Sequence, residues 1–345
     1  MIAQAVIMAG GEGRRLRPLT EERPKPLMPL LDEPVIGMTL RLLHRHGVER
    51  ATVTLRYMAG AVMDALGDGS AWGVRLRYSV EEAPRGTAGS VRDAVRSVPG
   101  TVLVMSGDCL TDADLSELAA QHEASGLRFS VVVRRMRGDV SAFGLCRAEA
   151  GRLTGFEEKP QDGADGGLIN TGIYLLDPAL LEQVPAEGLY DFGCDFIPAL
   201  LRAGEAVGAL ETTAYWCDIG SRDAYHRAQM DLLMGRVGLP VGGERRGHAI
   251  VAGGTQIDEG VRVTGRCYIG QGVRVGRGTV LGAGTILNGG SRVGRNVRLE
   301  NTTLWENARI DGGTVLRNVV VIPQRGSSNV QRLVLCGSLQ SRNAT

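Results

Sequence analysis

Short apolar runs rich in β-branched residues alternate with amphipathic stretches through the first half of the chain. The apolar runs predict strands over Ala5–Met8, Ala51–Leu55, Val74–Ser79 and Thr101–Met105, and the amphipathic stretches predict helices over Pro34–His46, Gly89–Val98 and Asp114–Ser125, the last capped by Asp112 or Asp114. Such alternation is typical of a mostly parallel sheet with helices on both faces. Ligands of these sheets bind beyond the carboxyl ends of the strands, where Gly10–Gly13 and Asp108 lie.

The hydrophobic period changes to six in the last third of the chain. Apolar residues recur at a strict spacing of six as Ile257, Val263, Ile269, Val275, Leu281, Leu287, Val293, Leu299 and Trp305, with glycines between them. A period of six fits neither a helix nor an alternating strand, and it indicates a hexapeptide β-helix whose coils stack their apolar residues. The register weakens after Trp305, because Asp311 falls on the next inward position.

Together the two patterns predict an α/β, Rossmann-like domain followed by a left-handed hexapeptide β-helix. We expect the boundaries to be 1–235 for the α/β domain, 236–249 for a linker, 250–323 for the β-helix and 324–345 for a C-terminal tail. Acidic and basic residues nearly cancel, with 38 of the former and 39 of the latter. We therefore expect neither nucleic acid nor a membrane surface as a partner, and an anionic ligand must be held by a few local cations.

The six cysteines are widely scattered and form no CxxC pair, which favours reduced thiols over disulfides or a zinc site. No signal-peptide pattern opens the sequence, and no apolar run approaches the roughly 20 residues that span a bilayer. We therefore expect a cytoplasmic protein.

A glycine-rich segment follows the first predicted strand. It reads Gly10-Gly11-Glu12-Gly13-Arg14-Arg15-Leu16-Arg17-Pro18-Leu19-Thr20, with Pro24-Lys25-Pro26 shortly after. Glycines there let backbone N–H groups approach phosphate, and the arginines add bidentate charge. The segment is not a Walker A loop, since no Gly-Lys-Ser/Thr closes it, and Leu16 stands where a dinucleotide fingerprint needs its third glycine. The alternative is a glycine turn with a solvated basic loop.

This segment resembles the signature of the nucleotidyltransferases that activate sugar-1-phosphates. The resemblance implies that the loop wraps an NTP and that Arg15 and Lys25 hold its phosphates. The residues implied to bind the nucleotide are Ala9, Gly10, Gly11, Gly13, Arg14, Gly86 and Thr87. Arg14 departs from the family, which usually has a small residue there, and Arg85 stands where most relatives have leucine before the base-binding turn.

Two aspartates resemble the metal-binding positions of the same family. Asp108 follows Met105-Ser106-Gly107 at the end of a predicted strand, and Asp218 lies within Tyr215-Trp216-Cys217-Asp218-Ile219-Gly220. Mg²⁺ takes one or two carboxylates together with phosphate oxygens, so both aspartates fit such a site. Either residue alone could equally be a turn or cap aspartate.

Three further segments resemble the sugar side of the family's site. They are Phe143-Gly144, Glu157-Glu158-Lys159-Pro160 and Ile169-Asn170-Thr171-Gly172. The resemblance implies that Gly144, Glu158, Asn170 and Thr171 contact the sugar phosphate and that Lys159 binds its phosphate. Each segment alone is compatible with an ordinary surface turn.

The implied activity is Mg²⁺-dependent transfer of a nucleotidyl group from an NTP to a sugar-1-phosphate, with release of pyrophosphate. Within the family the resemblance is strongest to mannose-1-phosphate guanylyltransferases, which implies GTP and mannose-1-phosphate. Glucose-1-phosphate with UTP, dTTP or ATP is the alternative pair. Two other classes stay open: a non-catalytic regulatory subunit that binds NDP-sugar, and an acyltransferase, although His248 is the only histidine near the coil. Exposed strand edges of a β-helix also predict a homo-oligomer.

Overall fold

The computed structural model describes residues 2–95, 100–160, 165–323 and 330–334. The chain divides into two compact units, each built from several segments. The first unit contains residues 1–12, 23–27 and 36–216, and the second contains residues 13–22, 28–35 and 217–345. Among the described residues, every helix is too short or too polar to cross a bilayer.

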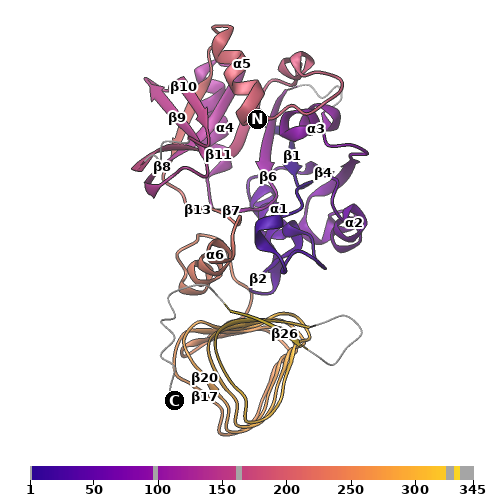
Figure 1. The fold of residues 1–345 in the computed structure, drawn as a ribbon, viewed down its shortest axis with the longest axis vertical. Helices are drawn as coiled ribbons and strands as arrows, with labels where there is room; N and C mark the ends of the chain where they lie inside the picture. Colours follow the sequence, from indigo (N-terminus) through magenta and orange to yellow (C-terminus); the bar gives the residue numbers. More distant parts are fainter. Residues whose placement is uncertain (1, 96–99, 161–164, 324–329, 335–345) are drawn as a thin grey trace. The chain divides into compact units, whose positions relative to one another are not determined.

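A nine-stranded sheet forms the centre of the first unit (Figure 1). Its strands, in spatial order, are β5 (Arg75–Val80), β4 (Arg50–Leu55), β1 (Ile2–Met8), β6 (Thr101–Ser106), β11 (Asp165–Leu176), β8 (Phe129–Asp139), β12 (Gly208–Thr212), β10 (Arg152–Glu158) and β9 (Gly144–Glu149). The four strands β5, β4, β1 and β6 run parallel, as predicted. Beyond them β11 pairs antiparallel with β6 and β8, and β9 pairs antiparallel with β10 and β11. The sheet is therefore mixed, and the expectation of a mostly parallel sheet was wrong for this half.

Helices connect the parallel strands. The helices of the chain are α1 (Val35–Arg45), α2 (Ala59–Leu66), α3 (Gly86–Ala94), α4 (Leu115–Ser125), α5 (Ile197–Arg202) and α6 (Arg222–Met234), with shorter helical turns at Arg14–Leu16, Lys25–Leu27, Ser70–Trp72, Pro178–Gln183 and Phe192–Phe196. Three of them, α1, α3 and α4, lie where the amphipathic stretches predicted helices, whereas α2 between β4 and β5 was not predicted. Asp114 caps α4 by accepting a hydrogen bond from the Glu117 amide at 2.9 Å, which confirms one of the two predicted caps. The end of the predicted Gly89–Val98 helix lies outside the described residues.

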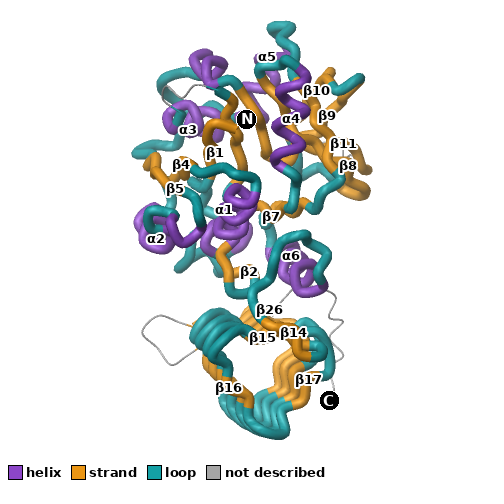
Figure 2. The backbone as a smooth tube through the Cα atoms, turned by 180° about the vertical axis from the view of Figure 1, so that it is seen from behind, coloured by secondary structure: helices purple, strands orange, loops and turns teal. Residues whose placement is uncertain are grey.

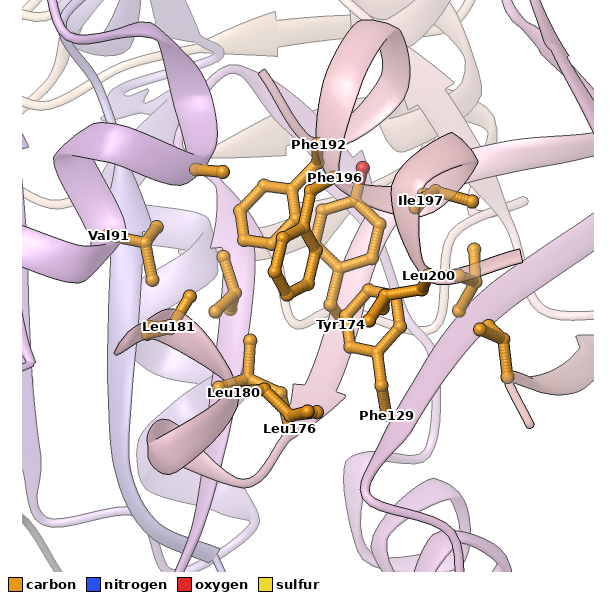
Figure 3. Packing of buried hydrophobic residues seen from close by; sticks show 14 of the residues in the cluster. Val91, Phe129, Tyr174, Leu176, Leu180, Leu181, Phe192, Phe196, Ile197 and Leu200 are labelled. Atoms are coloured by element: carbon orange, nitrogen blue, oxygen red, sulfur yellow. The ribbon is translucent and has the colours of Figure 1, made fainter. Parts of the chain in front are cut away.

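Four aromatic rings fill the core on one side of this sheet (Figure 3). Phe129 stacks on Tyr174 with ring centroids 5.8 Å apart, and Phe196 meets Phe129 edge to face at 5.4 Å. Phe192 lies 4.5 Å from the Tyr174 ring. Phe192 and Phe196 belong to one short helical turn, so the aromatic core fixes the segment around them against β8 and β11.

The second unit contains short strands that stack in parallel with a regular offset. Ala249 lies opposite Cys267 and Cys267 opposite Thr285, and the Gln256, Arg274 and Arg292 ladder repeats the same interval of eighteen residues. Three hexapeptides therefore make one coil. Figure 2 shows the turns of successive coils stacked on one another. This stacking is compatible with the predicted β-helix.

The strands of the second unit are mostly two or three residues long. They are β14 (Glu244–Arg246), β15 (Ala249–Val251), β16 (Gln256–Ile257), β17 (Arg262–Val263), β18 (Cys267–Ile269), β19 (Arg274–Val275), β20 (Val280–Leu281), β21 (Thr285–Leu287), β22 (Arg292–Val293), β23 (Arg298–Leu304), β24 (Arg309–Ile310), β25 (Val315–Pro323) and β26 (Val330–Val334). Strand β26 pairs antiparallel with β25, and most of the predicted tail over 324–345 lies outside the described residues.

Two consecutive coils are each shortened by a residue, which corrects the predicted stack at its end. Leu287 lies opposite Leu304, not Trp305, and Val293 lies opposite Ile310, not Asp311. The first shortening falls in strand β23, where Asn301 has φ 45°, and the second falls in β25, where Asn318 has φ 54° and Leu304 lies opposite Val321. Trp305 is still buried, but its indole Nε1–H donates to the Tyr225 hydroxyl of α6 at 3.0 Å.

Candidate active site

A cleft of about 290 Å³ opens in the first unit beyond the carboxyl ends of β1, β4 and β6. Met8, Thr54 and Ser106 contribute its floor from these three strands. Gly10, Gly11, Gly86, Thr87 and Asp108, all predicted site residues, line the same cleft. The structure therefore brings the start of the glycine-rich segment, the second glycine turn and the first aspartate around one cavity.

The glycine-rich segment leaves β1 along a tightly fixed path. The Ala9 amide donates to the Thr54 carbonyl at 3.0 Å, and the Gly107 amide donates to the Met8 carbonyl at 2.8 Å. A Cβ at Gly107 would lie 2.9 Å from Ile7 Cγ2, so a glycine is needed directly before Asp108. A Cβ at Gly11, by contrast, would meet nothing within 4 Å, and its backbone faces open space.

Lys25 and Asp108 form a close ion pair in the first unit. Lys25 Nζ lies 2.5 Å from Asp108 Oδ2, and the Ser106 hydroxyl donates to Asp108 Oδ1. The Lys25 side chain is 9% exposed, whereas that of Asp108 is 28% exposed on the cleft side. Burial alone would raise the pKa of Asp108, but the Lys25 ammonium and the hydrogen bonds from Lys25 and Ser106 outweigh it, so the pKa lies below its usual value. Asp108 is therefore ionised at neutral pH.

The remaining members of the first motif belong to the second unit. Gly13 has φ 64°, and its carbonyl accepts hydrogen bonds from the Leu16 amide and the Thr20 hydroxyl, both at 2.9 Å. This closes the turn that carries Arg14 and Arg15. Arg15 Nη2 lies 3.9 Å from Asp218 Oδ2, and both side chains are partly exposed. A Cβ at Gly220 would lie 2.5 Å from that same Asp218 oxygen, so glycine leaves room for the carboxylate.

Glu158 is enclosed by two glycines from different parts of the chain. A Cβ at Gly144 would lie 2.9 Å from Glu158 Oε2, and a Cβ at Gly193 would lie 2.9 Å from Glu158 Cδ. Lys159 Nζ lies 3.4 Å from Glu158 Oε1 and its side chain is 66% exposed. The two glycines thus create a recess for the carboxylate, and the Lys159 ammonium faces solvent beside it.

Asn170 and Thr171 are held by hydrogen bonds inside the first unit. Asn170 Nδ2 donates to the Tyr174 hydroxyl at 2.8 Å, and its Oδ1 accepts from the Gly172 amide at 2.9 Å. The Thr171 hydroxyl donates to the Val132 carbonyl at 2.7 Å, and Thr171 is 2% exposed. Asn170 is half-buried, whereas the Thr171 side chain is buried and bonded to the sheet.

The segment from Tyr190 to Asp195 was not anticipated from sequence. Asp191 Oδ1 accepts from both the amide and the hydroxyl of Thr87, at 2.8 and 2.9 Å, and Asp191 lines the cleft. Two residues later Gly193 approaches Glu158. The same short segment therefore contacts the glycine turn at Thr87 and the carboxylate at Glu158. The only local signal was a glycine between two aspartates in an aromatic stretch.

The described residues contain no group of three His, Cys, Asp or Glu side chains that could hold a metal ion by themselves. An ion at this site would rely on few carboxylates and on ligand oxygens, which is the usual arrangement for Mg²⁺ with phosphate substrates.

The chain is similar to known nucleotidyl transferases. The model of a family described as nucleotidyl transferase matches residues 4–235. The chain belongs to this nucleotidyl transferase family. Among its relatives, the mannose-1-phosphate guanylyltransferase of Mycobacterium tuberculosis is 30% identical over 316 residues, which covers 90% of this chain and 82% of the relative.

Other members of the family differ in the substrates that their names record. The UTP–glucose-1-phosphate uridylyltransferase of Synechocystis sp. is 29% identical over 303 residues, 77% of this chain and 78% of the relative. The solved structure of HddC from Yersinia pseudotuberculosis shares the fold, with a TM-score of 0.58 and 24% identity over 67% of this chain and all of that one. The chain is therefore a sugar-1-phosphate nucleotidyltransferase with a mixed α/β fold.

Proposed function

We propose that this nucleotidyltransferase joins GTP to mannose-1-phosphate and forms GDP-mannose and pyrophosphate. The Lys25–Asp108 pair beside a glycine-lined cleft is the observation that carries the reaction. The choice of GTP and mannose-1-phosphate is supported by the relative at 30% identity that bears this name. Glucose-1-phosphate with UTP is the alternative pair, favoured by the uridylyltransferase at 29% identity.

The reaction requires one phosphate oxygen of the sugar-1-phosphate to attack the α-phosphorus of the NTP while pyrophosphate leaves. The attacking phosphate is already ionised at neutral pH, so no general base is needed. Catalysis then depends on positioning the two phosphates and stabilising their charge. We assign the triphosphate to Lys25, Arg15 and the backbone of Gly10, Gly11 and Gly13.

The residues present fit Mg²⁺. Asp108 is ionised and partly exposed to the cleft, as a hard divalent ion requires of a carboxylate ligand. We propose Asp108 and Asp218 as the ligands. When bound, the ion would offset negative charge on the phosphate oxygens. Lys25 holds the Asp108 carboxylate in place and keeps it deprotonated.

On the sugar side, we assign sugar hydroxyls to Glu158 and Asn170 and the incoming phosphate to Lys159. The recess made by Gly144 and Gly193 holds the Glu158 carboxylate, and Tyr174 orients the Asn170 amide. Gly86 and Thr87 belong to the base side, where Asp191 fixes the turn. Thr171 supports this site through its bond to Val132, which places Asn170.

We further propose that residues 1–235 form the catalytic domain and that 250–323 form a left-handed β-helix after a linker at 236–249. The exposed strand edges of such coils tend to be covered by another copy, so we expect a homo-oligomer. We also propose that the protein is cytoplasmic. Light scattering tests the oligomeric state directly, and the mass of a single chain would contradict a homo-oligomer.

Pyrophosphate release tests the proposed substrates. The assay crosses GTP, UTP, dTTP and ATP with mannose-1-phosphate and glucose-1-phosphate in the presence of Mg²⁺. We expect release to be fastest with GTP and mannose-1-phosphate. A preference for another pair would keep the reaction and overturn the specificity, whereas binding of GDP-mannose without turnover by any pair would favour the regulatory subunit.

A further inference from the structure

The Arg85 side chain, which lines the cleft, makes an ion pair and hydrogen bonds within the protein. Its Nε donates to Asp93 Oδ2 at 2.9 Å, and its side chain is 13% exposed. Its two terminal nitrogens donate to the carbonyls of Gly188 at 3.4 Å and Pro185 at 3.3 Å. The guanidinium therefore clamps the loop 185–188.

Backbone hydrogen bonds hold the end of the same loop. The Tyr190 amide donates to the Arg85 carbonyl at 2.9 Å, and the Tyr190 carbonyl accepts from the amides of Ala88 and Gly89 at 3.0 Å each. A Cβ at Gly86 would lie 2.6 Å from that carbonyl oxygen, so the two segments are in close contact. Leu189 lies between residues that are fixed on both sides, at Gly188 and Tyr190.

The Leu189 side chain is exposed to solvent. It is 66% exposed, the highest fraction among the large exposed hydrophobic residues described, and it lines the cleft together with Pro84 and Thr87. A leucine held in place in a cleft offers a flat apolar ligand a contact that costs little ordering entropy. Of the parts of an NTP, only the nucleobase has such a face, since the phosphates and ribose are polar.

We propose that Leu189 is the apolar contact for the nucleobase, and that Arg85 is the positioning residue that presents it. The inference rests on the proposed function, because it assumes that this cleft binds the NTP. It adds a base contact from a loop that lies about a hundred residues beyond the glycine turn in sequence. Any base has an apolar face, so the contact contributes affinity for all four NTPs.

A comparison of NTP binding with binding of the phosphate chain alone distinguishes a base contact of Leu189 from a structural role. Calorimetry on the full chain measures the Kd of GTP and UTP, and of inorganic tripolyphosphate, for Leu189→Ala. Removing three carbons from a half-covered contact should weaken both NTPs about fivefold and leave tripolyphosphate unchanged. The control is Val315→Ala, since Val315 is 57% exposed and does not line the cleft.

Arg85→Ala should weaken NTP binding to the same extent and leave tripolyphosphate binding unchanged, although the Arg85 guanidinium bonds to Asp93 and the loop carbonyls and not to the base. Arg85→Lys should recover part of the affinity, and the double variant with Leu189→Ala should lose no more than either single one. If Arg85→Ala fails to fold, Leu189→Ala alone decides.

Unchanged NTP affinity in Leu189→Ala, or an equal loss for tripolyphosphate, would overturn the inference and leave the proposed function intact. Failure of the unmodified protein to bind any NTP would overturn both.

Discussion

Replacing Gly193 by alanine should move one carboxylate without disturbing the fold. The added Cβ would lie 2.9 Å from Glu158 Cδ and closer still to Oε2, whereas nonbonded carbon atoms normally keep about 3.5 Å or more. The carboxylate must therefore retreat by roughly 1 Å. Gly193 has no positive φ, so alanine adopts its backbone without strain, and the atom displaced is the end of a flexible side chain.

The expected result is a rise in KM for the sugar-1-phosphate with little loss of stability. A hydrogen bond to a charged group contributes about 1.5–3 kcal/mol, so its misalignment should raise this KM about tenfold or more. Steady-state pyrophosphate release at saturating NTP gives the KM, and thermal unfolding gives the stability. Gly60→Ala is the matched control, because a Cβ at Gly60 would meet nothing within 4 Å.

A normally folded Gly193→Ala variant with the wild-type KM for sugar-1-phosphate would contradict this prediction. Glu158 would then not contact the sugar, or its position would not matter. A parallel rise in the KM for NTP would also count against a role confined to the sugar side.

Three further predictions concern other parts of the molecule. Asp108→Asn should abolish pyrophosphate release. Because Lys25 lowers the pKa of Asp108 in the folded protein, the ionised carboxylate stabilises the fold above its unfolded pKa of about 4, and this stabilisation is lost as the pH falls. The variant should therefore lose less stability in acid, and an unaltered pH profile of denaturant unfolding would contradict this. Tyr225→Phe should cost about 1–3 kcal/mol, because the buried Tyr225 hydroxyl donates to the Pro29 carbonyl at 2.6 Å and accepts from Trp305; chemical denaturation measures it, and a loss within error of zero would refute it. Leu281→Ala removes a fully buried side chain from the coil stack and should cost about 2–5 kcal/mol, whereas an unchanged Tm would contradict the role of the stack.

The sequence predicted those parts of the fold whose hydrophobic pattern is local. The parallel strands β4, β5 and β6 were placed within one residue at each end and β1 within three, since each is a short apolar run bounded by turn residues. The antiparallel half was missed because β8 and β11 are long, and the register of β11 shifts between Asn170 and Tyr174. Pairing across such an irregularity depends on tertiary contacts.

The coil shortened at Asn301 could not be seen because Trp305 preserves the spacing of six. In the structure Leu304 takes the stacking place and Trp305 packs on Tyr225. Both residues are apolar, so the pattern alone does not distinguish them.

For the site, spacing and resemblance predicted the glycine turns and two aspartates, and Gly10, Gly11, Gly86, Thr87 and Asp108 of this set line the cleft. They did not predict Asp191, Gly193 or Leu189, because the contacts of these residues with Thr87, Glu158 and the cleft join segments that are remote in sequence. Arg85 shows the same limit. The sequence showed only that it stands where most relatives have leucine, and its partners Asp93 and the loop carbonyls are visible only in the folded chain.

Labelling of the NTP follows the α-phosphorus through the reaction. With an NTP labelled at that atom, Mg²⁺ and the sugar-1-phosphate, nucleotidyl transfer places the label in the NDP-sugar, and a γ-labelled NTP places it in pyrophosphate. We expect this division of label in the unmodified protein and its loss in Asp108→Asn. Release of γ-label as orthophosphate, or no α-label in a sugar product with any tested pair, would contradict it.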